Sequence, residues 1–169
     1  MLVEPDRETN LEMRSSESSL ANARAERQSI EPLPPPDSSP AAQVLLQSCR
    51  DFAKYGQWGD VEKIASNAAA AYPDEPNFYN QWVWAVYRQD RTIEAFQIIT
   101  QAAERFPRSV AIAYSTACLN GALKRVREAK RWLAQAIECA NNPDKVKLRS
   151  LVQPELQCVW NDGPADFTS

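Results

Sequence analysis

The feature that most constrains the fold is a pattern that repeats every 34 residues along most of the chain. Its columns hold small or apolar residues, acids and prolines at equal spacing. The aligned positions are Ala68, Ala102 and Ala136; Val61, Ala95 and Ala129; Ala65, Ile99 and Leu133; Asp60, Glu94 and Glu128; and Pro73 and Pro107, with Asn141 in the third place and Pro143 just after it. Chance rarely produces such columns at one spacing, so the chain is predicted to contain three copies of one structural unit.

The chemistry of the columns points to paired helices. A small residue at the start of a second helix lets that helix cross its neighbour closely, and another small residue seven positions later lies on the same face. The preceding acid lies near a helix N-terminus, where the helix dipole favours negative charge. Proline ends the unit because it cannot continue the backbone hydrogen bonds of a helix. The chain has only 4 glycines and many alanines, which also favours an all-α fold.

This pattern resembles the tetratricopeptide repeat, a family with two antiparallel helices in each unit of about 34 residues. The resemblance rests on residues 59–73, 92–107 and 126–138 and covers about residues 41–142. It implies an all-α fold, a right-handed α-α superhelix built as a solenoid. Helices are expected at 41–54, 60–71, 77–88, 93–105, 110–123 and 127–140. A seventh helix at about 144–152 and a segment ending at Trp160 are expected to give the last unit a polar cover.

Residues 1–40 have a different composition from the predicted repeat domain at 41–160. They hold half of the 12 prolines, and the run from Ile30 to Pro40 is typical of a polyproline-like or disordered linker. Eight acids and four bases give this segment a net charge of −4, whereas the remaining residues carry a net charge of +1. We expect an acidic N-terminal tail, disordered or loosely docked, that adds no core. Residues 161–169 are expected to form a short C-terminal tail.

The residue types needed for catalysis or metal binding are scarce. The chain has no histidine and no phosphate-binding, dinucleotide-binding or nucleophile-elbow glycine motif. We therefore expect no enzyme activity and no cofactor. The four cysteines form no C-x-x-C pair, so reduced, mostly buried thiols are expected rather than a zinc site. The carboxylates of Asp74 and Glu75 are interpreted as caps of the following helix.

No membrane or nucleic-acid partner is expected. The sequence lacks a run of about 18 apolar residues, and its first residues carry acids where a secretory signal would be basic and apolar. A cytoplasmic location is therefore expected. Basic residues cluster at 124–131 and 145–149, but the predicted repeat domain is nearly neutral, so these clusters are interpreted as solvated helix faces.

The resemblance also implies where a protein partner would bind, because the first helix of each unit lines a concave groove in this family. The groove positions are Gln43, Leu46, Gln47, Arg50 and Lys54 in the first unit, Asn77, Asn80, Gln81, Trp84, Tyr87 and Arg88 in the second, and Ala111, Tyr114, Ser115 and Cys118 in the third. All charged members are basic, and Trp84 is expected in the groove while Trp82 lies in the core. We expect the groove to attract a peptide segment that is acidic or ends in a carboxylate.

Several functions remain open at this point. The leading hypothesis is a protein-protein interaction module that binds a peptide segment of a partner in this aromatic and basic groove. The alternative is a small bacterial secretion chaperone, which likewise has about three tetratricopeptide units and an N-terminal extension. A homo-oligomeric scaffold is a further possibility, and the oligomeric state is not predicted. The carboxylate clamp of chaperone-tail binders is absent, since its positions are occupied by Leu46, Arg50, Gln81, Ala111 and Ser115.

Overall fold

A computed structural model describes residues 39–161. The expected N-terminal tail, apart from Ser39 and Pro40, and the expected C-terminal tail, apart from Asn161, lie outside the described residues. All regular elements in the described part are helical. They are α2 (Pro40–Lys54), α3 (Trp58–Ala71), α4 (Pro76–Tyr87), α5 (Thr92–Arg105), α6 (Val110–Ala122), α7 (Val126–Glu138), α8 (Pro143–Leu151), the 3₁₀ turn η1 (Pro154–Leu156) and α9 (Gln157–Asn161). The seven expected helices are thus confirmed, each end to within two residues.

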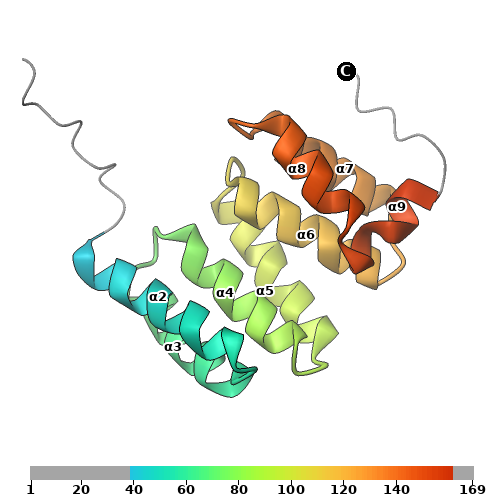
Figure 1. Cartoon of the computed structure of the whole chain (residues 1–169). Coiled ribbons are helices and arrows are strands. Elements are labelled where there is room, and N and C mark those ends of the chain that lie inside the picture. The colour runs from blue at the N-terminus through green and yellow to red at the C-terminus, as the bar shows by residue number, and fades with distance from the viewer. Residues whose placement is uncertain (1–38, 162–169) are drawn as a thin grey trace, which may run out of the picture. The chain divides into compact units, whose positions relative to one another are not determined.

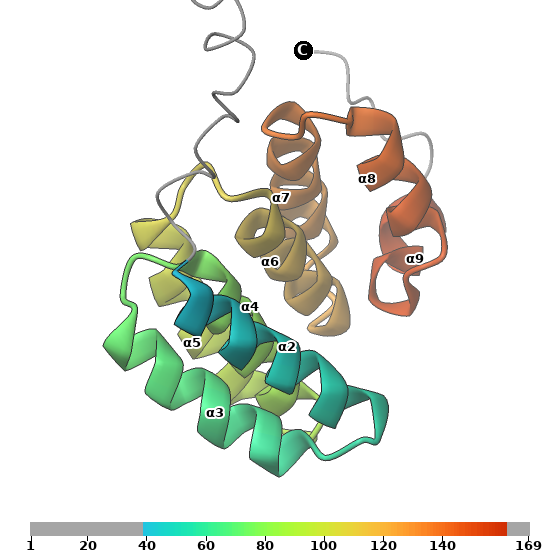
Figure 2. The same ribbon diagram turned by 60° about the vertical axis from the view of Figure 1, so that its left-hand side comes forward.

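The helices form three consecutive hairpins, α2–α3, α4–α5 and α6–α7, that stack in chain order (Figure 1). The second helix of each hairpin also packs against the first helix of the next, α3 against α4 and α5 against α6. The first helices touch one another in turn, α2 with α4 and α4 with α6. Figure 2 shows the same order from a second direction, with α8 and α9 beyond α6 and α7 at the C-terminal end. This arrangement is the solenoid of tetratricopeptide type that the repeat predicted.

The small columns of the repeat lie at the helix crossings. Ala68, Ala102 and Ala136 are 3%, 1% and 0% exposed. The two neighbouring columns are also buried, at Val61, Ala95, Ala129, Ala65, Ile99 and Leu133. The acidic column lies in the first turn of α3, α5 and α7, as the helix dipole favours. Close packing at equivalent crossings explains why the sequence repeats there.

The turn inside each hairpin uses one backbone conformation, although its sequence varies. Gly56, Asp90 and Lys124 are spaced 34 residues apart and have φ angles of 70°, 61° and 59°. This left-handed conformation is accessible to glycine without strain, is tolerated by aspartate and is less favourable for lysine. The weaker sequence match in the second and third turns therefore leaves the geometry of the hairpin unchanged.

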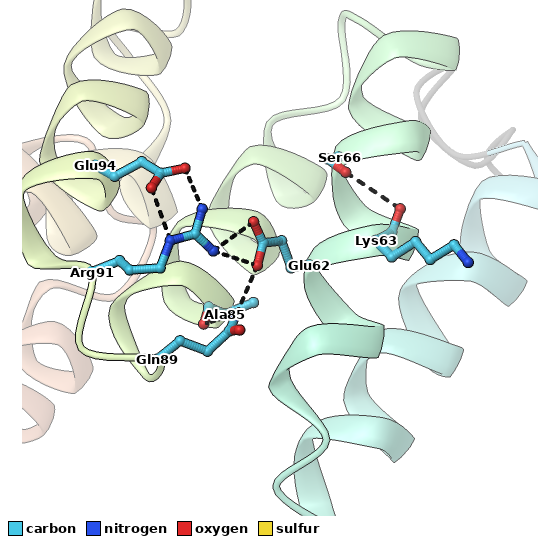
Figure 3. A network of polar contacts seen from close by, with 7 residues as sticks. All are labelled: Glu62, Lys63, Ser66, Ala85, Gln89, Arg91 and Glu94. Atoms are coloured by element: carbon cyan, nitrogen blue, oxygen red, sulfur yellow. Dashed lines mark hydrogen bonds and ion pairs between the residues drawn. The ribbon is translucent and has the colours of Figure 1, made fainter.

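A polar network joins the first hairpin to the second (Figure 3). Glu62 on α3 accepts hydrogen bonds from Gln89 at 2.7 Å and from Arg91 at 2.8 and 3.0 Å. Arg91 also donates to both carboxylate oxygens of Glu94, at 2.8 and 2.5 Å. Gln89 anchors the turn further by donating to the carbonyl of Ala85 at 3.0 Å. Because one carboxylate contacts two residues of the next hairpin's turn, the network fixes how these hairpins are oriented.

The C-terminal segment covers the last hairpin, and its outer surface is polar only in part: Asp144, Lys145 and Arg149 are exposed beside apolar side chains. Leu156 and Val159 are fully buried against α6 and α7 and complete that core. The opposite side of α8 exposes Leu148, and Leu151 and Val152 beside it are also exposed. None of the helices in residues 39–161 is long and apolar enough to cross a membrane.

Candidate partner-binding surface

The first helix of the stack presents a polar network at its surface. Arg50 donates two hydrogen bonds to the side-chain carbonyl of Gln47, at 3.2 and 2.9 Å, and Gln47 donates to Asp51 at 3.0 Å. Lys54 also pairs with Asp51, at 2.9 Å. The hydrogen bonds from Lys54 and Gln47 hold the pKa of the Asp51 carboxyl below its usual value. An acid thus lies among the predicted basic positions and offsets part of their charge.

The second and third hairpins are connected by a chain of hydrogen bonds between predicted groove residues. The indole nitrogen of Trp84 on α4 donates to the Ser115 hydroxyl on α6 at 2.9 Å. That hydroxyl donates in turn to the side-chain carbonyl of Asn80 at 2.5 Å. These three predicted groove side chains contact one another, but Ser115 is only 2% exposed and Trp84 and Asn80 are half-buried. These hydrogen bonds fix the spacing of α4 and α6 and orient the partly exposed Trp84 ring.

The N-terminal end of α4 is polar and partly open. Glu75 caps this helix, accepting from the backbone nitrogen of Asn77 at 3.1 Å and from its side-chain amide at 2.7 Å. This confirms the interpretation of Glu75 as a cap, whereas Asp74 instead pairs with Arg105 at 3.0 Å. Asn77 is exposed, and Gln81 one turn later is half-buried. These amides can donate to and accept from a peptide backbone.

The C-terminal end of α4 contacts the capping segment. Tyr87 is half-buried, and its ring meets Trp84 edge-on with 5.5 Å between the centroids. Burial and, to a lesser degree, the charge and hydrogen bonding of Glu155 on η1 raise the pKa of Tyr87 to about 12. A pocket of about 510 Å³ opens beside it. The lining residues are Tyr87, Thr92, Gly121, Ala122, Lys124, Pro154, Glu155, Gln157, Cys158 and Asn161.

Tyr114 lies beneath the capping helix rather than in an open groove. Its side chain is 4% exposed, and the guanidinium of Arg149 on α8 lies 4.8 Å from the centre of its ring. Among residues 39–161, its hydroxyl is the only buried side-chain nitrogen or oxygen without a hydrogen-bond partner. Burial raises the pKa of Tyr114 to about 12. The third hairpin therefore offers a partner less surface than the sequence predicted.

Three further predictions for the groove need correction. Leu46 is 8% exposed because it packs in a core cluster with Phe78, and Cys118 is fully buried under the capping segment. Ser115 is enclosed between Trp84 and Asn80, as described above. Arg88 is exposed, and its guanidinium lies 5.7 Å from the ring centre of Trp58 on α3.

Most of the other predicted groove positions are at least partly accessible. Gln43, Gln47, Arg50, Lys54 and Asn77 are exposed, and Ala111 is half-buried. The expected division between the two tryptophans of α4 is also visible. Trp82 packs against three core clusters, whereas Trp84 packs only against the cluster of the last hairpin and the cap.

The four cysteines are free. Cys49 and Cys118 are buried, and Cys139 and Cys158 are half-buried. Burial raises the pKa of the Cys49 and Cys118 thiols, so both remain protonated near neutral pH. Within the described part of the chain, no group of three or more cysteine and carboxylate side chains is placed to hold a metal ion.

The sequence analysis missed three charged residues at this surface: Asp51, Arg149 and Glu155. Arg149 had a detectable signal, because Gln81, Ser115 and Arg149 are separated by 34 residues and continue one column of the repeat into α8. Asp51 lies one position after the predicted Arg50, outside the regular helical spacing of the predicted groove positions. Glu155 follows no repeat column, and nothing local in the sequence indicates its position.

Because Tyr87 and Tyr114 have raised pKa values, the folded chain is expected to lose stability at high pH. Their pKa of about 12 in the folded chain lies above the value near 10 expected after unfolding. Their contribution is therefore complete below about pH 10 and decreases as the pH rises from about 10 to 12. Urea unfolding at pH 8, 10 and 11 measures this decrease, which should be smaller in Tyr87→Phe. Tyr55→Phe, at a side chain 81% exposed, is the control, and equal decreases in both variants would contradict the assignment.

Comparisons with known proteins give a structural likeness only. No family model matches the sequence, and no curated protein matches it. One similar solved structure is the type III secretion translocator chaperone SycD of Yersinia enterocolitica, in an alternative dimer. The match has a TM-score of 0.61 and 17% sequence identity, and it covers 74% of this chain and 96% of that chain. SycD in complex with a peptide of the translocator YopD gives a TM-score of 0.59 with 17% identity and the same coverage.

A further SycD structure gives a TM-score of 0.59 at 16% identity, over 74% of this chain and 88% of the other. At identities this low, the structural match establishes a shared fold and nothing more. The chain is an all-α protein of three tetratricopeptide-type hairpins followed by C-terminal capping helices.

Proposed function

We propose that this chain binds a segment of another protein on its concave surface and acts as a secretion-type chaperone for a specific client. One observation supports this above the others. A chaperone solved with a peptide of the translocator YopD has the same fold, and 96% of its chain is matched by 74% of this one. Because the match covers nearly the whole of that chaperone's chain, it favours the chaperone hypothesis over that of a general interaction module.

The chemistry of the concave surface suits peptide binding better than catalysis. The raised pKa values of Tyr87, Tyr114 and Cys118 keep these groups protonated and neutral near pH 7, which makes them poor bases and nucleophiles. The indole nitrogen of Trp84 already donates its hydrogen bond within the chain, to Ser115. We propose a binding role without enzyme activity.

The accessible part of the surface supports a particular way of binding. Trp84 and Tyr87 offer partly exposed aromatic faces, and Asn77 and Gln81 offer amides beside them. Aromatic residues are common anchors at protein interfaces, and amides can satisfy the backbone of a bound segment. We propose that the partner segment lies along α2 and α4, since the capping segment covers much of α6.

The chaperone hypothesis is tested by expressing the chain with and without a candidate client from the same source. The expected result is that this chain is soluble alone, that the client is soluble only when both are expressed, and that the two purify as one complex. A client that is equally soluble without this chain would contradict a chaperone role. A stable complex with an independently soluble protein would instead favour the general interaction module.

We predict that the basic residues of the surface favour an acidic segment. Replacing Arg50 and Arg88 by glutamate should weaken client binding about tenfold at low salt, because both changes oppose the field that attracts the segment. Added salt should weaken binding to the parent chain as well. Isothermal titration of the client at two salt concentrations measures both effects.

A charge-matched variant controls for the change in net charge. Lys63→Glu with Arg108→Glu alters two exposed cations on α3 and in the turn before α6, outside the proposed surface. This control should bind like the parent chain. Unchanged affinity of the Arg50 and Arg88 double variant at both salt concentrations would place the client elsewhere on the molecule.

A further inference from the structure

The outer face of α8 is apolar where the end of a solenoid is normally polar. We define this face by Lys145, Leu148, Leu151 and Val152. The exposed fractions of Leu148, Leu151 and Val152 are 65%, 47% and 78%. Leu148 is separated from the other two by three and four positions, the spacing of neighbours on a helix surface. The opposite side of α8 is used for packing, where Ser150 is fully buried and Val146 contacts the core of the last hairpin.

This concentration of apolar groups is unusual within the described part of the chain. Single exposed apolar residues are common on protein surfaces. Here, however, three of the six large hydrophobic side chains exposed in residues 39–161 lie on one face at the end of α8. A terminal repeat that lacks a polar outer face leaves a surface suited to a partner.

The same end of the stack is strongly basic. Residues 122–151 contain eight bases and three acids, a net charge of +5, whereas residues 40–121 contain seven bases and eight acids, a net charge of −1. Lys145, Lys147 and Arg149 all lie on α8, and none of them forms an ion pair with another described residue. Positive charge therefore surrounds the exposed apolar side chains without being neutralised locally.

We propose that the outer face of α8 docks an acidic amphipathic segment of a protein partner, at a site separate from the concave surface. The leucines of the bound segment would pack on Leu148 and Leu151, and the carboxylates of that segment would face Lys145 and Lys147. A segment of this kind buries the apolar row and neutralises the surrounding charge at the same time.

Other occupants fit this face less well. A nucleic acid would leave the apolar row unpaired with any apolar group. A second copy docked through the same face would place the lysines opposite lysines, and three apolar side chains fall short of the roughly 800 Å² per partner of a stable interface. A membrane-surface helix buries a long apolar side in the lipid, whereas the 9-residue α8 and the residue after it expose only three large apolar side chains.

The test uses the full chain and a synthetic fluorescein-labelled peptide with leucines on one helical face and glutamates elsewhere. A scrambled peptide of the same composition, which has no apolar face, is the peptide control. The chain variants are Leu148→Ser and Lys147→Glu. Their matched controls are Val44→Ser, at a side chain also 65% exposed, and Lys63→Glu, on α3. Circular dichroism confirms that each variant remains folded.

We expect the amphipathic peptide to bind the parent chain, as measured by fluorescence anisotropy, and the scrambled peptide to bind at least about tenfold more weakly. Leu148→Ser and Lys147→Glu should each weaken binding by about fivefold or more, whereas the two control variants should not. Absence of binding, or equal losses in the controls, would overturn the proposal. So would binding to vesicles containing phosphatidylglycerol that depends on Leu148 when peptide binding does not. Peptide binding that is weakened by Arg50→Glu with Arg88→Glu but not by Leu148→Ser would place the acidic peptide on the concave surface and overturn this proposal, while leaving the proposed function intact.

Discussion

Replacing Ala102 by phenylalanine is expected to lower the free energy of unfolding by about 1–3 kcal/mol, because it overpacks a helix crossing. Ala102 is 1% exposed and lies on α5 in a cluster with Val83, Ile99 and Ile112. That cluster takes residues from α4, α5 and α6, so an added ring would separate two hairpins rather than distort one helix. The equivalent alanines at 68 and 136 show that the fold requires a small residue at this position in all three units.

Urea unfolding followed by circular dichroism measures the change, and Gln101→Phe is the matched control. Gln101 is adjacent on the same helix but exposed, so the same ring added there meets solvent. The control should unfold close to the parent chain, within about 0.5 kcal/mol. If the Ala102 variant were as stable as the control, α5 would not cross its neighbours at this residue.

The positions of the helices could be predicted from the sequence because the signal occurs three times. A single alanine such as Ala102 says little, but alanine at 68, 102 and 136 with an acid eight positions earlier identifies a register. The left-handed conformation of Asp90 and Lys124 was not predicted, because neither residue suggests it alone; the structure shows that both repeat the turn of Gly56. Local helix signals and the repeat agree, so the boundaries were accurate to within two residues.

The candidate site was predicted less completely because its shape depends on contacts that no local pattern encodes. Trp84 and Asn80 contact Ser115 because the adjoining faces of α4 and α6 carry them, although the repeat equivalent of Ser115 is Gln81. The way in which the chain turns after α8 and brings η1 against α6 follows no repeat column. The repeat ends there, so its register cannot specify that turn.

The contact that holds this turn gives the second large prediction. Gly121 lies in the last turn of α6, and a Cβ atom added there would be only 2.0 Å from the carbonyl oxygen of Glu155. The obstacle is backbone rather than a flexible side chain, so α6 and η1 would have to separate. Separation would expose Leu156 and Val159, both fully buried, and would remove Glu155 from Tyr87. We expect Gly121→Ala to destabilise the chain by about 2–4 kcal/mol, although alanine is the better helix former.

Gly59→Ala is the matched control, because Gly59 lies in the first turn of α3 and an added Cβ would meet nothing within 4 Å. The same substitution should therefore have opposite effects at the two sites: Gly59→Ala should leave stability unchanged or raise it by up to about 1 kcal/mol. Amide hydrogen exchange identifies the destabilised region, because the backbone amides of residues 143–161 should lose protection in Gly121→Ala before those of α2 to α5 do. Equal stability of the two variants, with full protection of the cap, would show that η1 does not approach α6 closely. If the cap separates as expected, the Gly121→Ala variant also exposes Tyr114. Tighter client binding to this variant than to the parent chain would then show that the capping segment limits access to the third hairpin.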